Sequence, residues 1–483
     1  MDLIFDSIPN QKRERIMFQI RFICLAIGLA CGSCFLNARA SDSVLPNIVF
    51  IMADDCTFRD IGCYGGQAKT PNIDRLAMQG MKFRRCFQAA PMCSPTRHNI
   101  YTGLYPVKSG AYPNHTFVKD GTQSIVQYLK PRGYRLALSG KTHISPRSIF
   151  DFEYSGKKNP DMAEIENLFQ QCQASETPFC LFACSNEPHS PWDQGDATQY
   201  PPEEVQLPPY FVDTPETRSD MSKYLAEITY FDDQVGKIVE LLDKHDLTGN
   251  TMLEIVSEQG SSFAFGKWTC YETGLQSACI VKWPGKIEAG SESDAMIEYV
   301  DFLPTFLDAA HVERPEGLDG KSFLPVLTGA RKQHKQYAFG IMTTRGIING
   351  SDTYGIRSVR GQRFKYIRNL SPEIKFTNAC TQSTCFESWV TKAENGDLAA
   401  KERVKRYHFR PAEELYDLQS DALEWNNLAD DPAFSTIKNE LSQRLDSWMA
   451  QQGDLGQATE LAALERQGRN RKSKNKKSNK TRK

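Results

Sequence analysis

Four short apolar segments of this 483-residue sequence are each followed by polar side chains that could do chemistry. The groups after them are Asp54-Asp55, Lys141-Thr142-His143, His189 and Glu258-Gln259. Two adjacent carboxylates, such as Asp54 and Asp55, repel each other unless a cation joins them, and hard oxygen ligands of this kind suit Ca²⁺ or Mg²⁺. Glu258 and Gln259 add a carboxylate and an amide oxygen, so together these residues predict a divalent cation site. Taken alone, Asp54-Asp55 would more readily be a solvated turn or a helix cap.

A cysteine and an arginine form a further candidate group in the stretch Pro91-Met92-Cys93-Ser94-Pro95-Thr96-Arg97. A thiol can be a nucleophile, and a guanidinium four residues later can hold an anion. A buried structural cysteine or a disulfide partner is the alternative interpretation of Cys93.

The elements that must position these groups can be predicted from the apolar periodicity. Runs rich in Ile, Val, Leu and Phe predict buried strands over 47–53, 134–139, 179–184 and 251–257. Helices are predicted between them over 72–80, 123–131 and 221–245. This alternation predicts an α/β fold with a large, mostly parallel sheet flanked by helices. Because ligands bind at the carboxyl ends of such strands, all four polar groups should lie on one rim.

The remaining sequence predicts three further segments around the catalytic domain, which we place at 41–335. Strands at 363–368 and 414–418 and a closing helix at 432–451 predict a smaller C-terminal α+β domain over 336–455. Residues 456–483 are predicted to be a basic, disordered tail. Residues 1–40 are predicted to be a signal peptide.

The signal peptide is predicted from a charged start, an apolar run over 22–36 and the cleavage pattern Ala38-Arg39-Ala40. We therefore expect an exported protein, in a periplasmic, extracellular or lysosome-like compartment, that starts near Ser41 and has no membrane segment after cleavage. A membrane anchor is the weaker alternative, because the run is short and the cleavage pattern follows it. A lipoprotein anchor at Cys31 is also weaker, because Gly28 stands where a branched aliphatic residue would be expected.

Charge is distributed unevenly along the chain. Residues 41–465 hold 43 basic and 56 acidic residues, a net charge of −13, whereas 466–483 hold ten Lys or Arg and no acid. An acidic body argues against a nucleic-acid-binding fold. The basic tail would suit a polyanionic glycan or an anionic surface, or be a solvated terminus without function. The oligomeric state is left open.

The cysteine count predicts that at least one cysteine has no disulfide partner. Three of the 14 lie in the predicted signal peptide, and the remaining eleven are an odd number for an exported protein. Cys380 and Cys385 are near enough in sequence for a local disulfide, which an oxidising compartment would permit.

With its flanking residues, the Cys93–Arg97 stretch resembles the C-x-P-x-R signature of the formylglycine-dependent sulfatases of the alkaline phosphatase superfamily. Further elements resemble those of the family in the same order, over about residues 45–450: Asp54-Asp55, Gly140-Lys141-Thr142-His143, Glu187-Pro188-His189-Ser190-Pro191 and Gly266-Lys267-Trp268-Thr269. The resemblance implies an alkaline-phosphatase-like fold and an enzyme that hydrolyses sulfate esters or sulfamates.

The resemblance also implies a role for each site residue. Cys93 would be oxidised to formylglycine by a formylglycine-generating enzyme, and its hydrate would be the nucleophile. One Ca²⁺ would be held by Asp54, Asp55, the modified Cys93, Glu258 and Gln259. Arg97, Lys141 and Lys267 would bind sulfonyl oxygens, His189 with Lys267 would protonate the leaving group, and His143 would be the base that lets sulfate leave. Taken singly, the lysines would more readily be surface residues and the histidines hydrogen-bonded core residues; only their order together favours the catalytic roles.

One pair departs from the family pattern, which usually has Asp-Asn where this chain has Glu258-Gln259. Each side chain is one methylene longer, yet the ligand chemistry is unchanged, which fits a loop set slightly further back. The affinity for the metal, and the metal's identity, depend on this pair.

Several stretches resemble the heparan N-sulfatase branch of the family more than the arylsulfatases; they are 207–220, 232–236, 356–370 and 407–432. This resemblance implies a sulfated saccharide substrate, with N-sulfoglucosamine of heparan-type chains as one candidate. His115, Arg147 and the 376–410 region are candidates for the sugar pocket. The alternatives are a phosphodiesterase or phosphonate hydrolase of the same superfamily and a catalytically silent protein that binds sulfated glycans.

Overall fold

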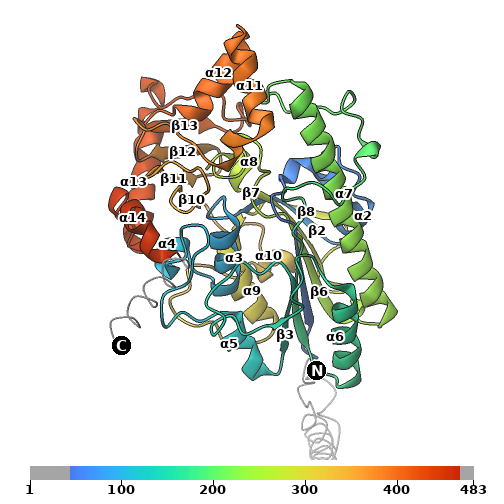
Figure 1. The fold of residues 1–483 in the computed structure, drawn as a ribbon. Helices are drawn as coiled ribbons and strands as arrows, with labels where there is room; N and C mark the ends of the chain where they lie inside the picture. The colour runs from blue at the N-terminus through green and yellow to red at the C-terminus, as the bar shows by residue number, and fades with distance from the viewer. Residues whose placement is uncertain (1–43, 468–483) are drawn as a thin grey trace, which may run out of the picture. The chain divides into compact units, whose positions relative to one another are not determined.

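The computed structural model describes residues 44–467, which Figure 1 draws in colour. The predicted signal peptide and the segment 468–483 lie outside the described residues. Among residues 44–467, no helix is both long enough and apolar enough to cross a membrane.

A nine-stranded sheet forms the centre of the described chain and runs in the order β4-β3-β5-β1-β6-β7-β2-β8, with β9 paired to β2. Its strands are β1 (Asn47–Met52), β2 (Met81–Phe87), β3 (Arg135–Gly140), β4 (Glu153–Tyr154), β5 (Phe179–Cys184), β6 (Thr251–Val256), β7 (Gln276–Lys282), β8 (Ser291–Ser293) and β9 (Ile297–Glu298). The strands from β4 to β6 are parallel, whereas β7 is antiparallel to both of its neighbours. The mostly parallel sheet predicted from the sequence is thus confirmed.

The four predicted strands end at the same level. Met52 pairs with Cys184 of β5 and with Val256 of β6, and Cys184 pairs with Gly140 of β3. Each of these residues is the last of its strand, so the polar groups that follow the strands start side by side. The rim expected from the sequence is therefore set by register.

Helices cover both faces of this sheet (Figure 1). One face carries α2 (Pro71–Gln79), α6 (Met162–Ala174) and the long α7 (Pro215–Lys244); the other carries α3 (Cys93–Thr102), α4 (Pro106–Ser109), α5 (Ile125–Leu129), α9 (Phe302–Ala309) and α10 (Leu324–Leu327). The start of α7 is fixed by Pro215 and by the Thr214 side chain, which accepts a hydrogen bond from the Thr217 amide. The apolar stripe predicted for this helix, with Leu225 and Ile228 among its members, is buried.

Asp232 of α7 caps the neighbouring helix α2. Its carboxylate accepts hydrogen bonds from the backbone amides of Asn72 at 3.1 Å and Ile73 at 2.8 Å, which the helix itself leaves without partners. We expect Asp232→Ala to lower the free energy of unfolding by about 2–3 kcal/mol, because two buried donors lose their acceptor. Urea unfolding measures this, with the exposed neighbour substitution Asp233→Ala as control, which should change stability by less than about 0.5 kcal/mol. Equal effects of both variants would contradict the capping role.

Glu254 is a buried acid in the middle of β6, a position where the apolar pattern of the strand is broken. It pairs with Phe50 of β1, whose ring packs against Phe302 and Phe306 of α9, so the carboxyl group lies on an apolar face. Neither of its oxygens has a hydrogen-bond partner among the described residues. Burial raises the pKa of Glu254 well above its usual value, so the folded protein holds this proton more tightly than the unfolded chain does.

The raised pKa of Glu254 predicts a pH-dependent cost to stability. The unfolded chain releases this proton near pH ~4.3 whereas the folded chain retains it, so stability falls by about 1.4 kcal/mol per pH unit above that value, up to the folded pKa. We expect Glu254→Gln to match the wild type in urea unfolding at pH ~4 and to be more stable at pH ~8. For the exposed control substitution Glu240→Gln, the dependence of stability on pH should run parallel to that of the wild type. A difference between Glu254→Gln and wild type that is constant with pH would contradict this account.

A second, antiparallel sheet follows in the order β10-β11-β12-β13. Its strands are β10 (Ala338–Thr343), β11 (Gly355–Arg360), β12 (Phe364–Asn369) and β13 (Glu413–Asp417), and the helices around it are α11 (Thr384–Glu394), α12 (Leu398–His408) and α13 (Ser435–Gln452). The smaller C-terminal α+β part predicted by the sequence is therefore present.

The structure corrects the predicted start of the tail. Residues 457–466 form α14 (Gln457–Ala462) and the 3₁₀ turn η9 (Ala463–Arg466), rather than a disordered segment. Glu460 explains this order, because its carboxylate makes a buried ion pair at 2.9 Å with Arg357 of β11.

The local disulfide considered for Cys380 and Cys385 does not form. All cysteines among residues 44–467 are free thiols, and these two bond to different hydroxyl groups: Cys380 to Tyr407 at 3.1 Å and Cys385 to Thr217 at 3.5 Å.

Candidate active site

The acids that follow β1 and β6 meet at the rim of the large sheet. The ligand atoms of Asp54, Asp55, Cys93 and Glu258 all lie within 4.8 Å of one another, and the four side chains are buried. The Gln259 amide group sits among them, with its nitrogen 2.6 Å from Asp55 Oδ1 and 3.1 Å from Cys93 Sγ. The structure therefore brings together all five residues predicted to hold a metal.

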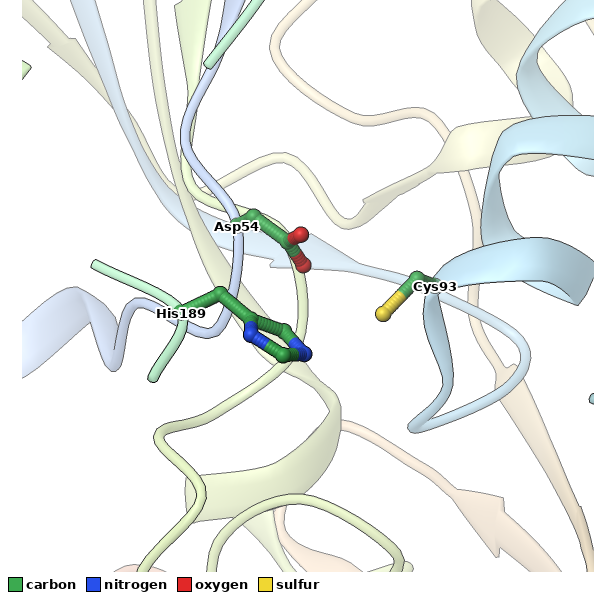
Figure 2. A group of neighbouring side chains, drawn as sticks. All are labelled: Asp54, Cys93 and His189. Carbon is green, nitrogen blue, oxygen red and sulfur yellow. The ribbon is translucent and has the colours of Figure 1, made fainter. Parts of the chain in front are cut away.

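Cys93 is the first residue of α3, at the positive end of the helix dipole. Figure 2 shows its sulfur facing the Asp54 carboxylate and the His189 ring, which come from the ends of β1 and β5. Its sulfur is also 4.0 Å from Lys141 Nζ. Burial raises the pKa of the Cys93 thiol to about 12, so this thiol is protonated at neutral pH.

Three cations surround Cys93, and each is held by a carboxylate. Arg97 Nε is 2.9 Å from Glu258 Oε1, Lys267 Nζ is 2.6 Å from Asp55 Oδ1, and Lys141 bonds to Asp54. Arg97 also donates to the Lys141 backbone carbonyl at 2.8 Å. Although burial alone would lower the pKa of Lys267, the Asp55 carboxylate raises it, so this side chain is a fixed positive charge. Such a cluster is suited to an anion whose negative charge grows on oxygen.

Lys267 is positioned by a loop that is tied to the cysteine segment. The Trp268 amide donates to the Pro91 carbonyl at 3.0 Å, and the Lys267 amide donates to the Ser261 carbonyl at 2.8 Å. Gly260 starts this loop where a Cβ atom would lie 1.8 Å from the Thr273 carbonyl oxygen, so no side chain fits there.

The donor set fits a hard divalent cation. Asp54, Asp55 and Glu258 present carboxylate oxygens, and the Gln259 Oε1 atom has no hydrogen-bond partner among the described residues. The Gln259 nitrogen points at three acids instead, and rotation of the amide by 180° would exchange the two atoms. Four oxygens would then converge on the centre of the cluster, as Ca²⁺ prefers.

The two candidate histidines differ in their surroundings. His189 bonds through Nδ1 to the Ser190 carbonyl at 2.6 Å, which leaves Nε2 directed to Asp55 Oδ2 at 3.7 Å. Asp55 acts to raise the pKa of His189, but burial and the nearby lysines outweigh it and lower that pKa to about 4.

His143 makes a contact that sequence reasoning did not predict. Its Nε2 lies 2.8 Å from Nδ1 of His115, and its Nδ1 has no partner among the described residues. Burial and the charge on Lys141 lower the pKa of His143 well below its usual value, so the ring is neutral. His115, expected as a sugar-pocket residue, is thus placed beside a candidate catalytic residue, and no local pattern in the sequence indicates this contact.

Backbone strain gathers at this rim. Asp55, His115, His143 and Trp268 all have positive φ angles between 49° and 66°, a region that side chains other than glycine rarely adopt. Such conformations are held at functional sites by the surrounding structure, because each costs about 1–3 kcal/mol. This clustering supports a functional role for the rim.

The other two predicted sugar-pocket candidates make contacts that do not include Cys93 or its cations, and their role stays a prediction. Arg147 is exposed and stacks over the Tyr154 ring at 4.5 Å. The 376–410 region forms η7 (Ala379–Gln382), α11 and α12, and it packs on the start of α7, where Trp389 donates to Thr217 at 2.8 Å.

Comparison with known proteins adds independent information. Residues 46–312 match the family described as Sulfatase, and residues 260–376 match the C-terminal domain described as N-sulphoglucosamine sulphohydrolase, C-terminal. The chain is 32% identical to an ulvan-active sulfatase of Formosa agariphila, over 87% of this chain and 83% of that protein. It is 26% identical to the human N-sulphoglucosamine sulphohydrolase, over 88% of this chain and 92% of the relative.

The fold also matches solved structures. One of them, described as a complex with its substrate D-glucosamine-2-N,6-O-disulfate, superimposes with a TM-score of 0.64 at 20% identity. The match covers 86% of this chain and 99% of that one. At this identity the likeness establishes the shared fold.

Proposed function

Because this chain belongs to the sulfatase family, we propose that it is an exported sulfatase that hydrolyses a sulfate ester or sulfamate on a sulfated glycan. The observation that carries the proposal is the convergence of Arg97, Lys141 and Lys267 on Cys93 at one sheet rim. Three cations around one side chain match a sulfate group, which has three free oxygens. A site for a neutral substrate would not need them.

Cys93 is the residue we propose to be converted to formylglycine by a maturation enzyme. In its unmodified state the buried thiol is protonated and would be a poor nucleophile, whereas a hydrated aldehyde offers a hydroxyl group at the same place. The Arg97 guanidinium, whose charge acts on Cys93, would hold that group in position.

Asp54, Asp55, Glu258 and Gln259 would hold Ca²⁺, and Cys93 lies close enough to complete the set. When bound, the ion would supply positive charge to the substrate oxygens and orient them. The residues themselves would keep Lys141 and Lys267 in place through Asp54 and Asp55.

The two histidines would handle protons. His189 Nε2 faces the cluster from the side of Lys267 and Asp55, and we propose that the two residues serve the leaving group together: the protonated Lys267 supplies the proton and the neutral His189 positions the leaving atom. His143 is neutral and contacts His115, and we propose that it removes the proton that lets sulfate depart. His115 would orient the His143 ring.

N-Sulfoglucosamine is the first substrate to test, because the match over residues 260–376 and the human relative both carry the name N-sulphoglucosamine sulphohydrolase. Ulvan and O-sulfated amino sugars are the next substrates to test, because other relatives are named as an ulvan-active sulfatase and an N-acetylglucosamine-6-O-sulfatase. We propose comparing kcat/KM for N-sulfoglucosamine, glucosamine 6-sulfate, an ulvan oligosaccharide and a phosphonate monoester, using protein from its native source. Turnover of at least one sulfated sugar above the phosphonate is expected.

Two outcomes would replace the proposal. Faster turnover of the phosphonate would indicate a phosphonate hydrolase of the same superfamily. Binding of sulfated sugars without any hydrolysis, by protein that carries the aldehyde and Ca²⁺, would indicate a silent glycan-binding protein.

A further inference from the structure

Helix α3 carries a second pair of polar side chains beside the pair Cys93 and Arg97. Ser94 and His98 follow these two residues directly in the sequence, have the same spacing of four residues and are both 0% exposed. Residues four apart lie on one face of a helix, so the second pair forms a face of its own, turned by about 100° from the first. Neither residue takes part in the chemistry proposed for Cys93 and Arg97.

The Ser94 hydroxyl joins the two loops that carry His143 and His115. Its Oγ atom donates to the backbone carbonyl of His143 at 3.0 Å. The same atom accepts the backbone amide of Thr116, the residue after His115, at 3.4 Å. One buried hydroxyl group therefore bonds to His143 itself and to the immediate neighbour of His115.

His98 holds the first of these loops two residues beyond His143. Its Nδ1 atom donates to the Ser94 carbonyl at 2.6 Å, and its Nε2 atom accepts the Ser145 amide at 3.1 Å. Nε2 also lies 3.2 Å from the Ser145 carbonyl, but the shorter distance at Nδ1 places the proton there. Burial lowers the pKa of His98 to about 4, so the ring is neutral at neutral pH and keeps this bond to the loop.

These bonds support a pair of histidines that hold strained backbone conformations. His115 and His143 have positive φ angles of 56° and 49°, which persist only where surrounding segments hold them. Between the two rings, His143 Nε2 lies 2.8 Å from His115 Nδ1. This contact leaves His143 Nδ1 as a ring nitrogen without a partner among the described residues.

We propose that Ser94 and His98 are positioning residues, which hold the His143 ring against His115 so that His143 Nδ1 can accept the proton whose removal lets sulfate depart. The inference rests on the proposed function. In that step a hydroxyl proton moves to His143 Nδ1, and the O–H electron pair becomes the second bond of a carbonyl group at residue 93. Sulfate leaves with the electron pair of the C–O bond that breaks.

The test compares Ser94→Ala with the matched control Ser109→Ala. Ser109 is also 0% exposed, and its Oγ atom donates to the Pro106 carbonyl at 3.1 Å and accepts the Ala111 amide at 3.3 Å. The two variants lose the same kinds of hydrogen bond. We expect Ser94→Ala to lower kcat about 30-fold and Ser109→Ala to keep it within threefold, with rates counted per mole of aldehyde found in the peptide mass.

The loss in Ser94→Ala should fall on the departure of sulfate alone. Because kcat/KM reports the steps up to release of the desulfated sugar, it should stay within threefold, and KM should fall together with kcat. Rapid mixing should show a burst of one desulfated sugar per active site before the slow steady state. A variant that merely loosens the fold would lower kcat and kcat/KM together.

Two further variants check each member of the pair. His98→Phe keeps a ring next to Phe150, which the His98 ring meets at 5.3 Å, but loses the bond to Ser145. It should show the same burst, with kcat lowered about tenfold. Ser94→Thr keeps a hydroxyl group and should return kcat to within threefold of the wild type.

NMR of the histidine ring nitrogens, in protein with an unmodified Cys93, gives a readout without turnover. The hydrogen bond between His143 and His115 should be seen in the wild type and in Ser109→Ala and be lost in Ser94→Ala. If the wild type hydrolyses no sulfated sugar but Ser94→Ala loses this bond, the proposed function fails and the positioning of the histidine pair stands. If sugars are hydrolysed and Ser94→Ala keeps the bond, or lowers kcat and kcat/KM equally, this inference is overturned.

Discussion

Replacing Cys93 with Ala is expected to lower kcat/KM for the preferred sulfated sugar by roughly 10⁴-fold or more. The substitution removes the group that would carry the nucleophile, while the surrounding cations Arg97, Lys141 and Lys267 stay held by their carboxylates. Substrate binding should therefore survive, and Kd for the sulfated sugar should change by less than about tenfold. The measurement is steady-state kinetics combined with calorimetric titration of the substrate.

The control for this prediction is Cys86→Ala, which removes another buried thiol from β2. It should keep kcat/KM within about threefold, since Cys86 pairs with Ser277 in the sheet and has no part in the cluster. Retained activity in Cys93→Ala, with the fold intact by circular dichroism, would rule out Cys93 as the nucleophile's source.

Removal of divalent cations is expected to have the second-largest effect. Stripping the enzyme with a chelator should lower activity at least 100-fold, and Ca²⁺ should restore it. Without the ion, the three buried carboxylates would be neutralised only by the lysines and the arginine around them. Added Ca²⁺ should also raise Tm, since a ligand that binds only the folded state stabilises it. The Tm readout is independent of activity.

The unusual length of Glu258 and Gln259 sharpens this prediction. Glu258 reaches Arg97 at 2.9 Å and Gln259 reaches Asp55 at 2.6 Å, so both longer side chains extend from their loop into the cluster. The double substitution Glu258→Asp with Gln259→Asn restores the usual family residues but withdraws each ligand by one methylene. We expect it to weaken Ca²⁺ binding about tenfold or more, a typical effect for disturbed metal sites.

The outcome of the double substitution is decisive for this loop. A Ca²⁺ affinity equal to or tighter than that of the wild type, measured by calorimetry, would show that the longer pair is not matched to the loop. In that case the departure from the family pattern would have no structural reason.

Much of the site could be predicted from the sequence because it follows regular elements. Asp54, Lys141, His189 and Glu258 each come soon after a buried apolar run, and parallel strands in register bring their carboxyl ends together. The membership in the sulfatase family expected from the Cys93–Arg97 stretch is confirmed by the match over residues 46–312. The roles of the individual residues remain predictions.

Other features depend on contacts between segments distant in sequence, and local pattern does not encode these. The pairing of His115 with His143 arises from a loop 28 residues away. Arg466 bonds to Gly110, 356 residues away in the sequence. A contact this distant cannot be predicted from the local sequence, which is why residues 457–466 were expected to be disordered. The antiparallel placement of β7 likewise follows from tertiary packing rather than from its own apolar run.

The most direct test of the account is the mass of the tryptic peptide Cys86–Arg97 from native protein after reduction and alkylation. Cys86 in the same peptide serves as an internal control, because a free thiol there must take up one alkyl group. We predict one alkyl group in total and a mass at position 93 that corresponds to an aldehyde in place of the thiol. A peptide with two alkyl groups would contradict the proposed conversion of Cys93 and, with it, the mechanism built on this residue.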